Sequence, residues 1–139
     1  MILLDTNVVS EVMKVAPSPT VLDWLNERPT STLYISSITV GEIVYGLRIL
    51  PDGKRRSRLG DRFERFVAEG FAHRVLAYDE PAARIYGEIM GVRREVGRPI
   101  STADGQIAAI ARANRLTIAT RNVADFEDCG VELFDPFGE

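Results

Sequence analysis

The sequence predicts an α/β fold built on a parallel sheet, and two observations lead to this prediction. Short apolar runs recur along the chain without the regular alternation of a strand that faces water on one side. Segments with the helical spacing of apolar residues separate these runs, and such an order predicts right-handed crossovers with helices covering the sheet. The chain has 139 residues, of which 45% are hydrophobic, which is enough for one domain over residues 1–139.

Five apolar runs are the expected strands. They lie at residues 2–4, 33–37, 74–79, 116–120 and 131–134. Runs without alternation fit strands that are buried on both faces, as in a parallel sheet. The first run ends on a carboxylate, Asp5, which needs an explanation because charged side chains are seldom buried without a partner.

Five segments between these runs have helical spacing. Their apolar residues fall within 21–25, 38–50, 59–67, 82–90 and 107–111. The turn signals Pro51-Asp52-Gly53 and Gly97-Arg98-Pro99 each divide two of these segments. Several crossovers are therefore expected to contain two helices instead of one.

The composition excludes several classes of site. The single histidine, His73, cannot supply a histidine acid–base pair, and the single cysteine, Cys129, allows neither an internal disulfide nor a cysteine-based zinc site. The formal net charge of −3 argues against a protein that holds nucleic acid by charge alone. The sequence shows no leader and no apolar run of membrane-spanning length, so we expect a cytoplasmic protein without membrane contact.

Three carboxylates are the main candidates for a functional site. Asp5 closes the first strand, Glu42 is expected in the first turn of the helix after the second strand, and Asp104 opens the last helix. Sites in open parallel sheets form outside the carboxyl ends of the strands. The three acids could therefore meet at one edge of the sheet.

Helix capping is the competing explanation for two of these acids. Thr39-x-x-Glu42 matches a capping box, and Ser101-x-x-Asp104 resembles one with Asp in place of Glu. An acid in a first turn also suits the helix dipole. For either acid taken alone, capping is the better interpretation.

The helical faces favour a site. Glu42 shares a face with Ile38 and Tyr45, and Asp104 shares one with Ile107 and Ala108, so both acids are expected to point inward. An unpaired inward charge is costly. A divalent cation that prefers oxygen ligands, Mg²⁺ or Mn²⁺, would hold such carboxylates together.

A polar cluster follows the expected strand at 116–120. Thr120 and Asn122 can hydrogen-bond a ligand, a water molecule or a carboxylate. Asp125 could complete the acidic set or simply begin a turn. The sequence leaves these two interpretations of Asp125 open.

Basic residues form a stripe on one predicted helix. Arg55, Arg58, Arg62 and Arg65 follow a 3-4-3 spacing and share one face. The stripe is either a solvated surface or a ridge that contacts phosphate. Among the aromatic residues, Trp24 and Tyr45 are expected in the core, with a place at an interface as the alternative.

Taken together, these residues resemble the PIN domain, and within it the VapC-like and FitB-like toxins of bacterial toxin–antitoxin pairs. The resemblance spans nearly the whole chain. It rests on MILLDTNVVSE, SSITVGEIVYGLRIL, DGQIAAIARANRLTIATRN and FDPFGE, in this order and spacing.

The resemblance implies a three-layer α/β/α sandwich around a five-stranded parallel sheet, and a ribonuclease that depends on Mg²⁺ or Mn²⁺. It implies a small antitoxin as partner, a homodimer, and contact with DNA only through the antitoxin. Water activated by the metal would attack an RNA phosphodiester bond and leave 3′-OH and 5′-phosphate ends.

The resemblance also assigns residues. Asp5, Glu42 and Asp104 fall on the acidic metal-site positions, and Thr6, Asn7 and Thr120 match polar residues around that site. The chain departs from the pattern at Asn122, where many members have Asp, so the number of metal ions stays open. A Mg²⁺-binding receiver-like signalling domain and a catalytically silent binding protein of the same fold are the alternative functions.

Overall fold

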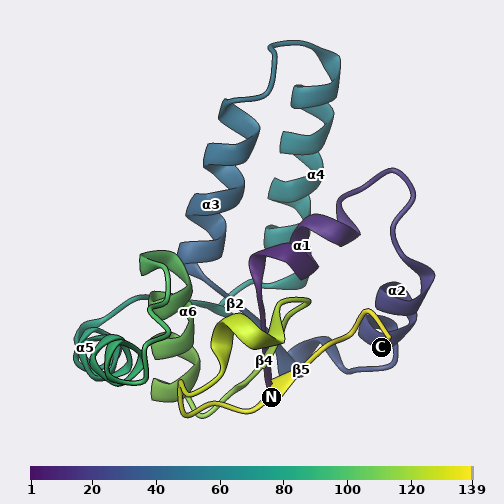
Figure 1. The fold of residues 1–139 in the computed structure, drawn as a ribbon. Coiled ribbons are helices and arrows are strands. Elements are labelled where there is room, and N and C mark those ends of the chain that lie inside the picture. Colours follow the sequence, from purple (N-terminus) through teal and green to yellow (C-terminus); the bar gives the residue numbers. More distant parts are fainter. Residues whose placement is uncertain (139) are drawn as a thin grey trace.

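The computed structural model describes residues 1–138, which form a five-stranded, all-parallel sheet between two layers of helices (Figure 1). The strands are β1 (Ile2–Leu4), β2 (Leu33–Ser36), β3 (Val75–Leu76), β4 (Thr117–Ala119) and β5 (Leu133–Phe134). This confirms the predicted fold class. The runs at 74–79 and 131–134 yield strands of only two residues, β3 and β5, which are the two edge strands of the sheet.

Within the described residues, six α-helices and two short 3-10 helices accompany the sheet. They are α1 (Thr6–Val12), α2 (Pro19–Asn26), η1 (Thr30–Thr32), α3 (Ser37–Arg48), α4 (Lys54–Gly70), α5 (Glu80–Glu95), α6 (Thr102–Ala113) and η2 (Val123–Phe126). The five helices expected from the sequence are all present. Two α-helices lie in each of the crossovers β2–β3 and β3–β4, as the turn signals indicated. The crossover β1–β2 also contains two α-helices, which the turn signals did not indicate.

Helix α1 was not expected from the sequence. It is short and contains Val8, Val9 and Val12, whose β-branched side chains have low helix propensity. Tertiary packing outweighs this propensity, because Val8 and Val9 are fully buried. The carboxylate of Asp5 caps the helix by accepting a hydrogen bond from Thr6 N at 2.8 Å.

The strand order β3-β2-β1-β4-β5 places β1 at the centre. The chain moves from β1 outward through β2 to β3, then returns to pair β4 with the other side of β1. The crossover directions therefore diverge between β1 and β4. A crevice outside the carboxyl ends of these two strands is the usual binding position in such a sheet.

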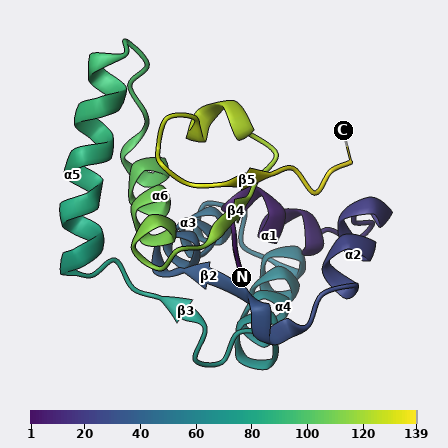
Figure 2. The same cartoon turned by 90° about the horizontal axis from the view of Figure 1, so that it is seen from below.

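Two apolar cores cover the two faces of the sheet. Leu3 packs into the core formed with α5 and α6, whereas the next residue, Leu4, packs into the core formed with α1, α2, α3 and α4. Figure 2 shows α5 and α6 on one side of the sheet and α1, α2 and α4 on the other. This alternation explains why the strand runs are apolar throughout.

Helices α3 and α4 form a hairpin that extends beyond the sheet (Figure 1). Its turn contains Pro51-Asp52-Gly53, as predicted, and Gly53 has a φ of 149°, which favours glycine. Within residues 1–138, none of the helices is long and apolar enough to cross a membrane.

Candidate functional site

A pocket of about 440 Å³ lies at the carboxyl edge of β1 and β4. Asp5, Glu42 and Asp104 all line it, from the end of β1, from α3 and from α6 respectively. The predicted polar residues Thr6, Asn7 and Asn122 line it as well. The fold thus brings the three predicted acids to one pocket at the divergence between β1 and β4.

Asp5 is the buried centre of the pocket, with 5% of its surface exposed. Its Oδ1 accepts a hydrogen bond from Thr6 N at 2.8 Å, and its Oδ2 accepts one from Thr120 Oγ1 at 2.8 Å. Burial raises the pKa of Asp5 to about 6, against the opposing effect of these hydrogen bonds. The nearby charges of Asp104 and Glu42 raise the pKa further.

Thr120 is fully buried and links three residues of the pocket. It donates to Asp5, and its Oγ1 also accepts from Asn122 N at 3.0 Å and from Asn7 Nδ2 at 3.3 Å. Asn7 Nδ2 lies 3.2 Å from Asp5 Oδ2. These contacts fix the orientation of the Asp5 carboxylate.

Glu42 lies one turn later than predicted. Ser36 caps α3, because its Oγ accepts from Thr39 N at 3.1 Å, so Glu42 is the sixth helical residue and the predicted capping box with Thr39 is wrong. The inward orientation is also wrong, since Glu42 is exposed and Tyr45, on the same face, is 67% exposed. Glu42 still faces the pocket, where its Oε1 accepts a hydrogen bond from Thr6 Oγ1 at 2.6 Å.

Asp104 follows the prediction more closely. Ser101 caps α6 by accepting a hydrogen bond from Asp104 N at 3.2 Å, and Ile107 and Ala108 on the same face are fully buried. Asp104 itself is half-buried. Burial raises its pKa, and the charges of Asp125 and Glu42 add to this effect.

Asp125 lies in the turn η2, is exposed, and does not line the pocket. Its charge nevertheless contributes to the raised pKa of Asp104. Its carbonyl oxygen accepts a hydrogen bond from Arg93 Nη1 at 2.9 Å. The structure therefore places Asp125 within a short 3-10 helix, with its side chain outside the pocket.

The pocket also contains residues that the sequence reasoning missed: Ser10, Glu11, Lys14 and Arg121. Glu11 is buried, and its pKa is lowered, first by the hydrogen bond from Lys14 and then by the one from Ser18 N. The spacing of Asn7, Glu11 and Lys14 by four and three residues would have indicated one helical face. This spacing is informative only if residues 6–12 are first recognised as a helix.

The donor set suits a hard divalent cation, because carboxylate and hydroxyl oxygens surround the pocket and the charges of Asp104 and Glu42 help to raise the pKa of Asp5. Within residues 1–138, however, no three acidic, histidine or cysteine side chains are placed to hold one ion together. The carboxylate of Glu42 is instead engaged by Thr6. The predicted ligand set fits Mg²⁺ or Mn²⁺ by its chemistry and stays a prediction.

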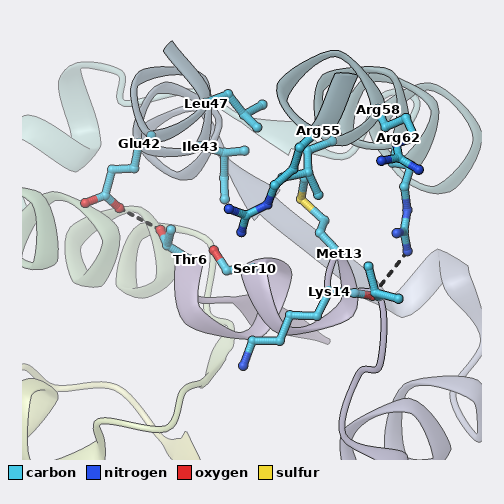
Figure 3. Close-up of a pocket in the computed structure, with 13 residues that line it drawn as sticks. Thr6, Ser10, Met13, Lys14, Glu42, Ile43, Leu47, Arg55, Arg58 and Arg62 are labelled. Atoms are coloured by element: carbon cyan, nitrogen blue, oxygen red, sulfur yellow. Dashed lines mark hydrogen bonds between the residues drawn. The ribbon is translucent and has the colours of Figure 1, made fainter. Parts of the chain in front are cut away.

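A second pocket, of about 450 Å³, adjoins the first, and the two pockets share Thr6, Ser10, Lys14 and Glu42. It lies between α1, α3 and α4, and Figure 3 shows Arg55, Arg58 and Arg62 of α4 gathered with Ile43 of α3 and Met13, which follows α1. Three arginines of the predicted stripe therefore line a pocket together. The fourth, Arg65, is exposed and does not line it.

The two aromatic residues considered for the core have different environments. Trp24 is buried and stacks on Phe134, with ring centroids 5.4 Å apart. Tyr45 is exposed on α3, so its expected core position is wrong.

Comparison with known proteins identifies the family. The family model described as the PIN domain matches residues 2–130. The chain belongs to the PIN-domain family. Over 137 residues, this PIN domain is 42% identical to the VapC ribonuclease Y4jK of Sinorhizobium fredii, covering 99% of this chain and 98% of the relative.

Two further comparisons agree. This PIN domain is 41% identical over 137 residues to the toxin FitB of Neisseria gonorrhoeae, covering 99% of each chain. Its fold matches the structure of FitAB bound to an IR36 DNA fragment with a TM-score of 0.93 and 40% identity, over 100% of this chain and 97% of the other.

Proposed function

We propose that this PIN domain is a metal-dependent ribonuclease and the toxin of a toxin–antitoxin pair. The observation that supports this most directly is the pocket in which Asp5, Glu42 and Asp104 meet at the divergence of β1 and β4. The relatives named VapC ribonuclease and toxin FitB, at 42% and 41% identity over nearly the whole chain, support it independently. The receiver-like alternative would place a lysine after the last strand, and both Lys14 and Lys54 precede β3.

In this proposal Asp5 and Asp104 would hold Mg²⁺ or Mn²⁺, with Glu42 joining directly or through water. The bound ion would lower the pKa of a water molecule and neutralise charge on the phosphodiester. Thr6 and Thr120 hold the Asp5 carboxylate in a fixed orientation through hydrogen bonds of 2.8 Å each. Asn7 supports the same carboxylate from α1.

The partners follow from the two adjoining pockets. The acidic pocket would receive RNA, and the arginine-lined pocket would contact RNA or a small antitoxin. FitAB is seen bound to DNA, and we propose that DNA reaches this chain only indirectly, through its antitoxin. We further propose that the protein acts in the cytoplasm as a homodimer, with exposed apolar residues of α3 at the interface.

The proposal predicts that Asp104→Asn lowers RNA cleavage by about a hundredfold or more, since it removes a charged oxygen ligand. The measurement is cleavage of a fluorescent RNA by purified protein in Mg²⁺, in Mn²⁺ and in EDTA. Glu132→Gln, which removes one exposed charge outside the pocket, is the matched control and should cleave normally.

Two outcomes would contradict the mechanism. Cleavage that persists in EDTA would remove the metal from the proposal, and an active Asp104→Asn enzyme would remove this carboxylate from the site. A wild-type protein that binds RNA and metal yet never cleaves would favour the catalytically silent alternative.

A further inference from the structure

Two positively charged side chains also line the acidic pocket, and the proposed mechanism does not yet use them. Lys14 follows α1 and Arg121 follows β4, and both line the pocket together with Asp5 and Asp104. A phosphate of RNA that approaches these carboxylates is repelled by them. Cations at the same pocket offset this repulsion, and they do so most effectively when their positions are fixed before the substrate arrives.

A buried carboxylate links the two cations. Glu11 Oε1 accepts a hydrogen bond from Lys14 Nζ at 2.9 Å and lies 3.9 Å from Arg121 Nη2. Glu11 Oε2 accepts a hydrogen bond from Ser18 N at 2.9 Å, which fixes the carboxylate itself. One buried acid therefore holds a lysine and an arginine that come from different parts of the chain.

Arg121 is held at two further points. Its backbone N donates to Asn7 Oδ1 at 3.2 Å, and its guanidinium carbon lies 3.8 Å from the centroid of the Phe137 ring. Stacking on a ring fixes the plane of a guanidinium and leaves its N–H groups free to donate at the edge. Arg121 is also the neighbour of Thr120, which hydrogen-bonds Asp5.

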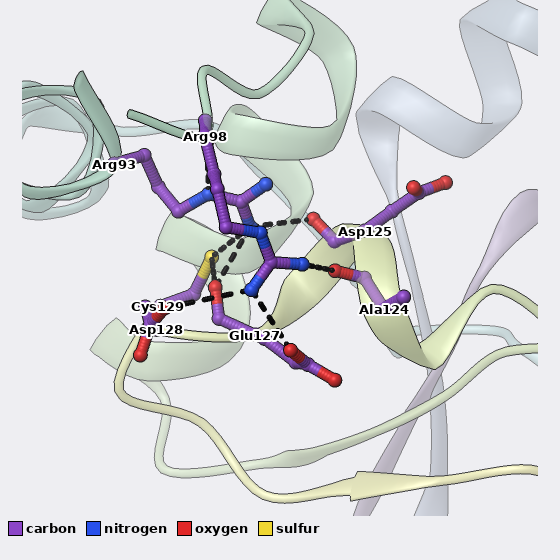
Figure 4. Close-up of polar contacts among 7 residues, drawn as sticks. All are labelled: Arg93, Arg98, Ala124, Asp125, Glu127, Asp128 and Cys129. Carbon is purple, nitrogen blue, oxygen red and sulfur yellow. Dashed lines mark hydrogen bonds and ion pairs between the residues drawn. The ribbon is translucent and has the colours of Figure 1, made fainter. Parts of the chain in front are cut away.

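The arginine at position 93 shows what a purely structural arginine looks like in this protein. Arg93 is 4% exposed and donates to the carbonyl oxygens of Arg98, Asp125 and Glu127 (Figure 4). The side chains of Arg121 and Lys14 are 55% and 58% exposed instead. Among residues 1–138, the guanidinium of Arg121 donates no hydrogen bond, so its donors are available to a ligand.

We propose that Lys14 and Arg121, positioned by Glu11, bind a backbone phosphate of single-stranded RNA beside the acidic cluster. This inference rests on the proposed function, because it assigns the substrate contacts of that same pocket. The lysine supplies a point charge with two unused donors, and the arginine supplies a planar pair of donors that matches phosphate oxygens.

The test compares two double variants that lose the same charge. Lys14→Gln/Arg121→Gln removes the pair, and Arg84→Gln/Arg115→Gln removes two exposed arginines outside the pocket. Binding of a fluorescein-labelled, single-stranded RNA is measured by anisotropy in EDTA over a series of salt concentrations. Loss of the pair should weaken binding at low salt by on the order of tenfold and flatten the log–log salt slope by roughly 0.7 per lost contact.

Cleavage kinetics in Mg²⁺ provide the second measurement. The Lys14→Gln/Arg121→Gln protein should show a raised KM with kcat changed by only a few fold, since the pair binds the phosphate in the ground state as well as in the transition state. The control variant should match the wild type in KM, kcat and salt slope.

The outcomes separate this inference from the proposed function. A wild-type protein that cleaves RNA, with a salt slope that the pair variant leaves unchanged, would overturn the phosphate contacts alone. A flattened slope in a protein that binds RNA but never cleaves it would support the contacts and overturn the ribonuclease. Three other outcomes would also overturn the contacts. These are equal losses of RNA binding in both double variants, no RNA binding by the wild type, and a pair variant that loses affinity for the antitoxin but not for RNA.

Discussion

Asp5 illustrates how one side chain serves both the fold and the pocket. It caps α1 through Thr6 N and accepts a hydrogen bond from Thr120, and these two contacts connect β1, α1 and the end of β4. The same position is costly for a charge, because burial raises the pKa of Asp5 from 3.8 to about 6. A pocket that keeps such a charge without a bound cation is electrostatically strained.

This strain gives a prediction for Asp5→Asn in the absence of metal. The folded carboxyl group binds its proton more tightly than the unfolded one, so stability falls as the pH rises from about 4 to about 6 and stays reduced above that. The shift of the pKa from 3.8 to about 6 corresponds to about 3 kcal/mol at neutral pH. Asp5→Asn should therefore unfold at a higher temperature than the wild type at neutral pH, by an amount that shrinks towards pH 4.

Thermal unfolding in EDTA across this pH range is the measurement, with Glu132→Gln as the control for loss of one exposed charge. Asparagine keeps the acceptor for Thr6 N but can lose the one for Thr120, which reduces the gain. A variant less stable than the wild type at neutral pH would show that the hydrogen bonds of the carboxylate outweigh its burial.

The three acids differ in how well their positions could be predicted from the sequence. Asp5 and Asp104 are each fixed by a local feature, a strand end and a serine cap, and both lie as expected. Glu42 depends on which residue caps α3, and several serine and threonine residues precede it. Because Ser36 is the cap, Glu42 lies on an exposed turn and reaches the pocket only at its rim.

Among the elements, α1 explains most of what the sequence did not reveal. Most of its seven residues have low helix propensity, and it forms because Asp5 caps it and Val8 and Val9 are buried. Without α1, the positions of Glu11 and Lys14 in the pocket could not be derived. The strands and the five longer helices were predictable because each has a clear apolar pattern.

The 3-10 helix η2 is held in place by hydrogen bonds from Arg93 of α5 and from Arg98, which follows α5. Arg93 of α5 donates to the carbonyl oxygens of Asp125 and Glu127 at 2.9 and 2.7 Å, and Arg98 Nη2 donates to that of Ala124 at 3.1 Å (Figure 4). Arg93 is buried, so loss of its guanidinium leaves carbonyl groups without a donor. Each such group costs roughly 1–3 kcal/mol.

We therefore predict that Arg93→Met lowers the unfolding free energy by at least about 2–3 kcal/mol, and that Arg98→Gln lowers it by less than about 1 kcal/mol, because Arg98 is exposed. Denaturant unfolding of both variants against the wild type is the measurement. Equal effects of the two substitutions would show that η2 does not depend on the buried arginine.

At the scale of the whole molecule, charged and apolar surfaces are separated on the α3–α4 hairpin. On one side of the hairpin, Arg55, Arg58 and Arg62 line the second pocket, the one between α1, α3 and α4. They give a chain with a net negative charge a local positive surface. Elsewhere on α3 and at its C-cap, Val44, Tyr45 and Ile49 are 48%, 67% and 65% exposed. Neighbouring apolar side chains on one exposed helix are a common feature of protein–protein interfaces.

The proposed homodimer can be tested at this surface. Tyr45→Glu places a charge among exposed apolar residues, and a charge at the centre of an interface is penalised by desolvation. We predict that this substitution raises the dimer dissociation constant by at least about tenfold, equivalent to 1.4 kcal/mol, and leaves the unfolding of the monomer unchanged. Tyr45→Phe is the matched control, because it keeps the ring and should keep the dimer. Sedimentation over a range of protein concentrations measures both, and an unchanged dissociation constant in Tyr45→Glu would move the interface away from this face of α3.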